Sequence, residues 1–306
     1  MGRLNITLGI FFLCLKLFSI HADDSCDKST CPGPIAYYKS LGCLPVRKNP
    51  EDCCAYKYNC AEVESRPLDK CHVNNNSYNL GERLRDEDAN PCDVGCTCIM
   101  SHTGDFAKFN CAIVDCFHGP AKPGCYRRNR PDRCCPGEEV CPDNPEDRAT
   151  CVVDGKTYKE GEYFKDPSDP NKNCICQAGY EGKNVEPFCR APRHPYCQPD
   201  FRHRGDVINN CAPVYYSNQS PQTSCSVFSR CQNNNDTIIT NPDNSSQKDN
   251  DMICKFGTLV MHYGDEIKQA TDYSSVCVKC VCEVGPVPTC QRLPDNECDV
   301  TNHSPF

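Results

Sequence analysis

Cysteine offers the most chemistry in this chain, where 31 of 306 residues are Cys. Such thiols can form disulfides, bind a soft metal ion such as zinc, or act as nucleophiles. The C-x2-C-x-C spacing of Cys277, Cys280 and Cys282 is one that thiolate zinc sites use. In an oxidising compartment, disulfides take precedence over the other two uses. We therefore expect crosslinks, with no metal site, no cofactor and no cysteine nucleophile.

Motifs of common catalytic sites are missing from the sequence. It has no G-x-S-x-G, no H-E-x-x-H and no glycine loop of the phosphate-binding kind. The eight His residues are scattered along the chain. We therefore expect that the protein is not an enzyme.

The first 22 residues indicate the compartment. Residues 1–22 have a basic start, then an apolar run, and end on the small residue Ala22, which is the pattern of a secretory signal peptide. Lys16 interrupts the run, and no later stretch reaches the roughly 18 apolar residues that a membrane span needs. Cleavage also removes Cys14 and leaves an even number of cysteines. We expect a secreted, extracellular chain in which full pairing is possible.

The charge of the chain bears on its partners. The formal net charge is -8, and loss of Arg3 and Lys16 with the signal makes it more negative. Nucleic acid and anionic membrane surfaces are therefore not expected partners. A basic protein ligand is compatible with this charge.

The cysteines follow a repeated order, of which one complete copy spans residues 71–141. A copy with eight cysteines spans 151–231, while 23–70 matches the back half of the order and 254–306 matches the front half. The polar stretch 232–253 has no cysteine and is expected to be a linker or a long surface loop. All cysteines of the complete copy are expected in disulfides; they are Cys71, Cys92, Cys96, Cys98, Cys111, Cys116, Cys125, Cys134, Cys135 and Cys141.

A second pattern follows the first cysteine of each front half. An aromatic or apolar residue stands seven positions later, and a Gly-acid pair begins ten positions later. Apolar residues alternate around the Gly, which predicts a short hairpin whose Gly has a backbone conformation that other residues resist. The acid is expected to be a solvated turn residue. The three sets are Tyr78, Gly81 and Glu82; Tyr158, Gly161 and Glu162; and Met261, Gly264 and Asp265.

Two cysteine positions are missing together from the copy 151–231. Ser224 replaces the first cysteine of the adjacent pair, and the other position is lost near Pro170 or Asn171. Their joint loss suggests that the two positions form one bridge. The hypothesis for the complete copy is therefore a bridge between Cys92 and Cys134, joining its front and back halves.

Adjacent cysteines act as crosslinking nodes. Their alpha carbons lie about 3.8 Å apart, which is shorter than a relaxed bridge requires. Each member of the pairs Cys53–Cys54 and Cys134–Cys135 should therefore bond elsewhere. Cys26 and Cys298 lie at the open edges of incomplete halves, so we expect unusual pairing there, within the chain or in a covalent dimer.

The order C, C-x2/3-C-x-C, C, C, C, C-C, C, with Tyr-x-x-Gly-Glu after the first cysteine, resembles the von Willebrand factor type C module. The chain as a whole is similar to small secreted members of the chordin and kielin-like proteins. The resemblance implies a small disulfide-rich, mainly β fold: tandem elongated modules with short antiparallel strands and irregular loops.

The resemblance also implies binding rather than catalysis, classically of bone morphogenetic protein (BMP) or another growth factor of the transforming growth factor type (TGF-β). Apolar residues of the front subdomains 71–98 and 151–176 would then contact the ligand, and packing inside the module is the alternative for them. The candidates are Val73, Tyr78, Leu80, Leu84 and Tyr158.

The hypothesis of a role in cell adhesion depends on one tripeptide. Arg204, Gly205 and Asp206 spell Arg-Gly-Asp between two cysteines. If exposed, this tripeptide suits an integrin, so a matrix or adhesion protein is one alternative function. A secreted defence, venom or saliva factor, such as a protease inhibitor, is another alternative.

Glycan is expected at four N-x-S/T sequons. A fifth sequon, at Asn302, is less favourable because Pro305 follows its Ser304. The four expected sites are Asn75, Asn218, Asn235 and Asn244.

Overall fold

The computed structural model describes residues 26–191, 197–242, 251–268, 277–294 and 296–298. The chain is mainly β with few helices, and its strands are short and mostly antiparallel. Fifteen disulfides hold it together. The predicted signal peptide 1–22 lies outside the described residues.

Three stretches, here called the first, second and third front units, share one layout. They comprise residues 71–111, 150–190 and 251–294, the last without 269–276. The opening hairpins are β3–β4 (Cys71–Val73, Asn76–Tyr78), β9–β10 (Thr150–Val153, Lys156–Lys159) and β17–β18 (Ile253–Phe256, Leu259–His262). The strands that follow are β5–β6 (Thr97–Met100, Ala107–Asn110), β11–β13 (Tyr163–Asp166, Asp169–Ile175, Cys189–Arg190) and β19–β21 (Glu266–Ile267, Val278–Val281, Thr289–Arg292).

The other three stretches, here called the first, second and third back units, comprise residues 26–60, 116–141 and 197–231. Their hairpins are β1–β2 (Leu44–Val46, Lys57–Asn59), β7–β8 (Tyr126–Arg127, Glu139–Val140) and β14–β15 (Ala212–Tyr215, Phe228–Arg230). The helices are α1 (Ile35–Leu41), α2 (Ala61–Glu64), α3 (Pro199–Arg202) and α4 (Arg204–Ile208), with 3-10 turns at Lys28–Thr30 and Pro145–Asp147.

Local sequence explains the opening hairpins. The β3–β4 turn has φ of 49° at Asn74 and 65° at Asn75, the left-handed region that Asn tolerates and that two-residue hairpin turns need. The corresponding turn of the second front unit uses Asp154 and Gly155, with φ of 49° and 74°. The hairpins predicted after the first cysteine of each front half are therefore confirmed.

The repeated glycine has the same role in all three front units. Gly81, Gly161 and Gly264 have φ of 85°, 87° and 78°. Each amide donates a hydrogen bond of 2.8 Å to the carbonyl oxygen of a disulfide cysteine, respectively Cys98, Cys176 and Cys282. The predicted special backbone conformation is confirmed.

The acid after that glycine caps its own turn. The carboxylates of Glu82, Glu162 and Asp265 accept hydrogen bonds of 2.8, 2.9 and 2.7 Å from the backbone amide three residues earlier. Glu82 and Glu162 are exposed, whereas Asp265 is buried. All three are turn residues, as predicted, but only the first two are solvated.

The bridges repeat with the units. Front units share two of them: Cys71–Cys98 and Cys96–Cys111; Cys151–Cys176 and Cys174–Cys189; Cys254–Cys282 and Cys280–Cys290. Back units share two others: Cys31–Cys54 and Cys43–Cys60; Cys116–Cys135 and Cys125–Cys141; Cys197–Cys225 and Cys211–Cys231.

The remaining three bridges bear on the predicted Cys92–Cys134 bridge and on the pairing of the cysteines in the incomplete halves. Cys92 is bonded to Cys134, the pair that the two missing cysteines nominate, and it ties the first front unit to the second back unit. Cys53 occupies the repeat position of Cys134, and it is bonded to Cys26 of its own back unit. Cys277, at the position of Cys92, is bonded to Cys298. Cys26 and Cys298, for which unusual pairing was expected, are thus bonded within the chain.

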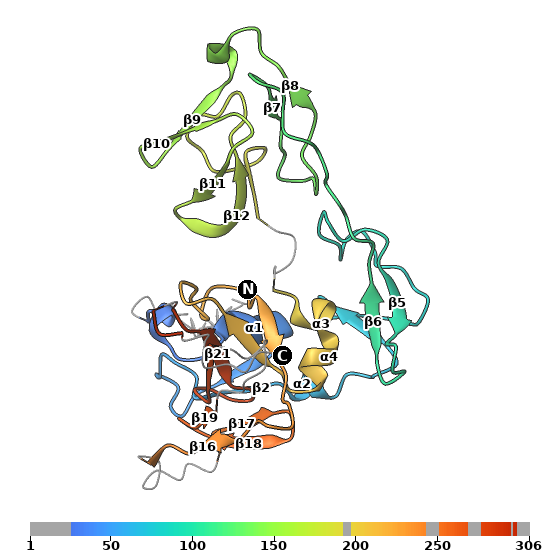
Figure 1. Cartoon of the computed structure of the whole chain (residues 1–306), viewed down its shortest axis with the longest axis vertical. Helices are drawn as coiled ribbons and strands as arrows, with labels where there is room; N and C mark the ends of the chain where they lie inside the picture. The colour runs from blue at the N-terminus through green and yellow to red at the C-terminus, as the bar shows by residue number, and fades with distance from the viewer. Residues whose placement is uncertain (1–25, 192–196, 243–250, 269–276, 295, 299–306) are drawn as a thin grey trace, which may run out of the picture.

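Figure 1 shows an upper lobe with β7 to β12 and a lower body with the helices. The upper lobe joins the second back unit to the second front unit: Arg128 Nε lies 3.1 Å from Glu160 Oε1, and the side-chain Nδ2 of Asn129 donates to the Gly161 carbonyl. A side chain at Gly161 would clash with the carbonyl oxygen of Arg127. The two units therefore pack through close backbone contact.

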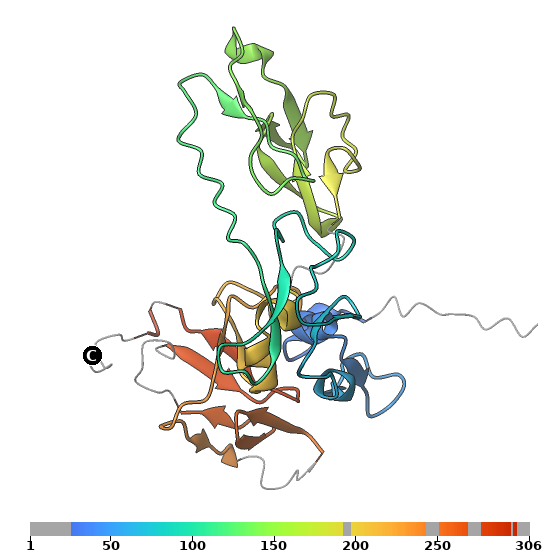
Figure 2. The ribbon, with the colours of Figure 1, turned by 90° about the vertical axis from the view of Figure 1, so that its right-hand side faces the viewer.

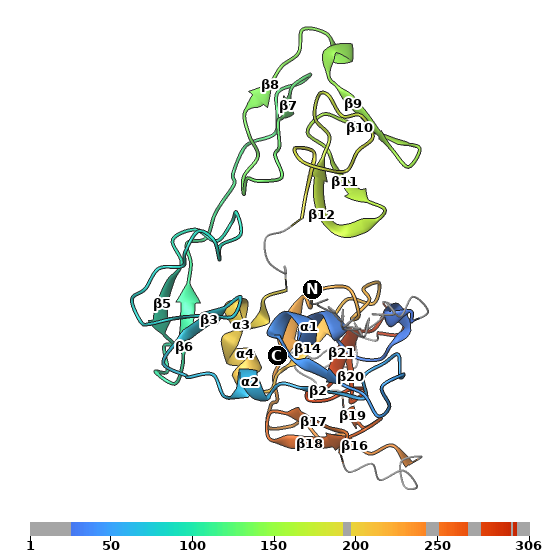
Figure 3. The ribbon, with the colours of Figure 1, turned by 180° about the vertical axis from the view of Figure 1, so that it is seen from behind.

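The lower body combines pieces from distant parts of the sequence. Strand β14 pairs parallel to β21, so the third back and third front units share a six-stranded sheet. The Tyr38 hydroxyl of α1 lies 2.8 Å and 2.9 Å from the carbonyl oxygens of Val284 and Val287. Figure 3 shows α1 against the part of the body that carries β14 and β21. The first back unit and the third front unit are therefore packed together, although they lie far apart in the sequence.

The polar stretch 232–253 is only partly described, up to residue 242 and from 251. Its residues Ile238–Ile239 form β16, which pairs with β19 at the edge of the six-stranded sheet. Asp236 is buried and bonded to Arg230. The described part is therefore anchored to the body, which favours the long surface loop over the linker among the two expectations for this stretch.

Candidate functional site

Most of the predicted ligand-contacting residues belong to the cores of their front units. Val73 and Tyr78 are only 5% and 3% exposed, and the Tyr78 hydroxyl is bonded to Asp88. Leu84 is half-buried against the same cluster, and Tyr158 is half-buried with its ring 5.6 Å from that of Phe164. For Val73 and Tyr78, this burial favours the alternative of packing inside the module over contact with a ligand.

Leu80 differs from these residues because it is 48% exposed. It lies between the opening hairpin and Gly81, in the turn held by the Gly81 hydrogen bond. Tyr263 has the same position before Gly264, nine residues after the first cysteine, and is also 48% exposed. Two front units thus present a large apolar side chain from the same rigid turn.

The second front unit has an acid at this position. Glu160 is 6% exposed and bonded to Arg128 of the neighbouring back unit. This turn is therefore covered by the packing of the upper lobe. Sequence reasoning missed Tyr263, although its fixed offset from Cys254 was a signal that could have identified it.

The Arg-Gly-Asp tripeptide begins helix α4. Arg204 is 4% exposed, its Nη1 lies 2.7 Å from Asp200 Oδ1, and its Nη2 donates to the Pro67 carbonyl. A side chain at Gly205 would come within 2.8 Å of the Phe106 ring. The exposure that an integrin-binding tripeptide needs is not met at Arg204, whose guanidinium is committed to internal contacts.

Asp200 is the centre of the network that holds α3 and α4. Its second oxygen lies 2.7 Å from Arg66 Nη1, so one buried carboxylate is shared by two guanidinium groups. The next residue, Phe201, is 5% exposed and packs in the core of the first front unit. These contacts fix the third back unit on the first front unit.

A second buried carboxylate lies in the upper lobe. Asp166 is 1% exposed and accepts hydrogen bonds from the Ser168 hydroxyl at 2.7 Å and the Lys172 ammonium at 3.0 Å. These two groups, the hydroxyl first, hold the pKa of Asp166 well below its usual range. The arrangement stabilises the charged form of the Asp166 carboxylate at the turn between β11 and β12.

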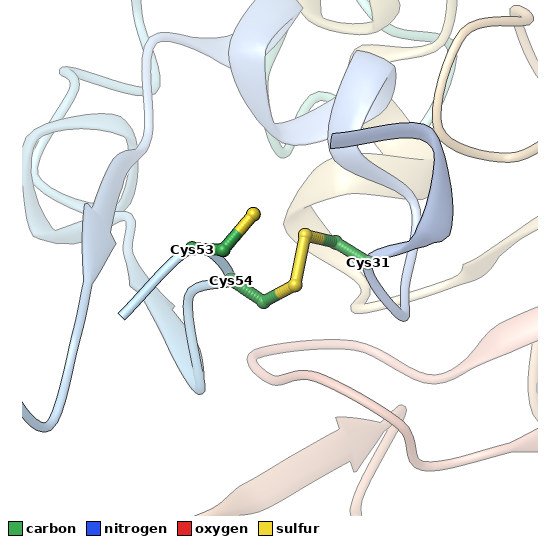
Figure 4. A group of neighbouring side chains, drawn as sticks. All are labelled: Cys31, Cys53 and Cys54. Atoms are coloured by element: carbon green, nitrogen blue, oxygen red, sulfur yellow. A yellow bond between two sulfur atoms is a disulfide. The ribbon is translucent and has the colours of Figure 1, made fainter. Parts of the chain in front are cut away.

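The adjacent cysteines form compact sulfur groups that resemble metal sites in spacing alone. Figure 4 shows Cys54 joined to Cys31, while the Cys53 side chain points elsewhere. Its partner is Cys26. Cys134 and Cys135 also bond to separate partners, so the prediction for adjacent cysteines is confirmed. A sulfur in a disulfide has no thiolate to offer a metal ion.

The three cysteines with the C-x2-C-x-C spacing of zinc sites are also in disulfides. Cys277, Cys280 and Cys282 are bonded to Cys298, Cys290 and Cys254, in that order. In this oxidised state the three sulfurs are crosslinks.

A pocket of about 530 Å³ lies beside the bridge between Cys92 and Cys134. Its charged lining mixes both signs, so it favours neither an anion nor a cation. These lining residues are Asp86, Asp93, Asp132, Arg133, Arg190 and Arg202.

Three of the predicted glycosylation sites can be placed. Asn75 is exposed at the tip of the β3–β4 hairpin, and Asn218 and Asn235 are exposed in turns. Asn244 and Asn302 lie outside the described residues. The three placed side chains can carry glycan without repacking.

Within the described ranges, none of the helices has the length and apolar character required to cross a bilayer. A scan against protein-family models gave no match to this chain. No solved structure gave a significant match either.

Proposed function

We propose that this chain is a secreted binding protein that captures an extracellular protein ligand, with a BMP or TGF-β-type growth factor as the first candidate. The signal-like residues 1–22 and the fifteen bridges support an oxidising, extracellular setting. The growth-factor class rests on the resemblance in cysteine order. The negative net charge suits a ligand with basic surface patches.

The observation that carries the proposal is the matched exposure of Leu80 and Tyr263. Each side chain stands on a turn fixed by a glycine hydrogen bond to a disulfide cysteine. A rigid turn loses little conformational entropy on binding, so burial of its apolar side chain contributes directly to affinity. Aromatic and aliphatic anchors of this kind commonly dominate protein interfaces.

The proposed function is tested by titrating the purified, glycosylated chain against an immobilised growth-factor dimer of this class. Leu80→Glu and Tyr263→Glu place a charge in the interface, so we expect each to weaken binding about tenfold or more. Val185→Glu is the matched control, because Val185 is an exposed apolar residue (57%) of the second front unit. Equal binding by all four proteins, or no binding by the wild type, would reject the proposal.

The adhesion alternative has no comparable support. It requires a free Arg204 guanidinium, and that group is buried against Asp200. Identification of proteins captured from extracellular fluid separates a growth factor from an integrin or a protease.

A further inference from the structure

The segment Ile113–Phe117 follows β6, overlaps the start of the second back unit, and takes no part in the surfaces described above. Figure 2 shows the chain running there as a long, drawn-out stretch from the lower body to the upper lobe. It contains neither helix nor strand. Its two large apolar side chains are unusually open to solvent: Ile113 is 96% exposed and Phe117 is 84% exposed.

Burial along this segment alternates as in a strand. Ile113, Asp115 and Phe117 are exposed, whereas Val114 and Cys116 are half-buried. A period of two places the three exposed side chains on one face. That face presents an apolar residue, a carboxylate and a second apolar residue in succession.

The backbone of the segment is also unpaired. The amide of Ala112 donates to the carbonyl of Val94, but none of the amides from Ile113 to Phe117 has a hydrogen-bond partner among the described residues. The same holds for the carbonyl groups of these five residues within the described ranges. An extended segment with free donors and acceptors is a template for another strand.

Disulfides keep the segment in place. Cys111, two residues before it, is bonded to Cys96, and Cys116 within it is bonded to Cys135. The segment is therefore fixed near both of its ends in the unbound protein. Binding to it requires little ordering of this chain.

The carboxylate of Asp115, at the centre of the segment, determines which partner strand fits. A second copy of this chain, paired in register or antiparallel about Asp115, would place two Asp115 carboxylates opposite each other, which is unfavourable. A strand with Lys or Arg between two apolar residues, each two positions away, matches the carboxylate and both apolar side chains. We propose that residues 113–117 bind such an extended basic-apolar strand by β-strand addition.

This inference is independent of the proposed function and has its own probe. The probe is the capped peptide Thr-Val-Thr-Lys-Thr-Val-Thr, titrated against the whole chain with fluorescence anisotropy. A Glu-for-Lys peptide tests charge, and a peptide N-methylated throughout tests backbone pairing. We expect the Lys peptide to bind at least about threefold more tightly than the Glu peptide, and the methylated peptide not to bind.

Variants of the chain complete the test. Asp115→Lys should reverse the preference in favour of the Glu peptide, a result that misfolding cannot produce. Ile113→Thr and Phe117→Thr should weaken binding, whereas Val185→Thr should not. Equal binding of the three peptides, retention of the Lys preference by Asp115→Lys, or failure of every peptide to bind would overturn the inference.

Self-association is the competing outcome. Sedimentation velocity of the wild-type chain should show no concentration-dependent dimer. The contrary result would be a dimer of the wild type that is absent from Ile113→Asp. Such a dimer would assign the segment to a second copy of the chain and would overturn the choice of partner.

Discussion

Replacing Arg204 by Ala should loosen helices α3 and α4 while leaving the upper lobe intact. The change removes one charged hydrogen bond to Asp200 and one hydrogen bond to the Pro67 carbonyl, both in a buried environment. Asp200 keeps Arg66, so its charge is not left uncompensated. We therefore expect a local loss of about 2–3 kcal/mol, less than the 3–5 kcal/mol typical when a buried charge loses its only partner.

Amide hydrogen exchange is the assay, because it measures opening free energies segment by segment. A loss of 2–3 kcal/mol should accelerate exchange of residues 199–208 about 30- to 150-fold. The hairpin β9–β10 in the upper lobe should not change and serves as the internal control. Asp200→Asn, which leaves Arg66 and Arg204 without their carboxylate, should accelerate exchange more than Arg204→Ala does.

Arg130→Ala is the matched control variant. Arg130 also pairs with a carboxylate, Asp132, at 2.9 Å, but its side chain is 51% exposed, so its loss should cost about 0–1 kcal/mol. Exchange in residues 199–208 that differs less than about threefold between Arg204→Ala and wild type would refute the structural role of Arg204. By the same reasoning, Asp206→Glu should not change cell adhesion to the native protein.

Three further predictions concern the repeated units. Gly161→Ala should lower the thermal midpoint more than Gly81→Ala, because both have positive φ but only Gly161 faces a backbone carbonyl; equal shifts would contradict this. The Asp166 pKa is depressed in the folded state, so its stabilisation is present above the unfolded pKa of about 4 and is lost as pH falls below it. Exchange protection of β11–β12 should therefore fall in that acid range, and in Asp166→Asn it should lose this dependence. Replacing both Cys92 and Cys134 by Ser removes a bridge of sequence separation 42 and should lower the free energy of unfolding by about 4 kcal/mol. We expect rapid protease cleavage between the upper lobe and the lower body. An unchanged digest would argue against this.

The features that could be predicted are those set by short stretches of sequence. The left-handed glycine of each front unit, the two-residue hairpin turns and the separate partners of adjacent cysteines follow from backbone geometry alone. The Cys92–Cys134 bridge was accessible because the chain contains a copy that lacks both positions. Repetition within one sequence therefore acted as an internal comparison.

The features that could not be predicted depend on contacts between distant residues. Arg204 is hydrogen-bonded to Pro67, which lies 137 positions away, and Tyr38 is bonded to Val284 across 246 positions. Neither pairing leaves a periodic signal. The hydrophobic character of Val73 and Tyr78 was recognised, but their burial depends on the whole core of the front unit, including Phe201 of α3.

For the candidate site, the solvent exposure of each side chain is what could not be predicted from the sequence. Leu80 and Val73 are both apolar and lie in one front unit, yet only Leu80 projects into solvent. The difference arises because Val73 lies within a strand, while Leu80 lies in the turn that follows the hairpin. Sequence alone assigns both to a ligand or to the core without deciding between them.

The hydrogen-exchange footprint of the chain bound to a growth-factor dimer is the most direct test of the proposed binding surface. We predict that binding protects the turns around Leu80 and Tyr263 and leaves the covered turn at Glu160 unchanged. Protection confined to other segments, or no complex with this ligand class, would contradict it.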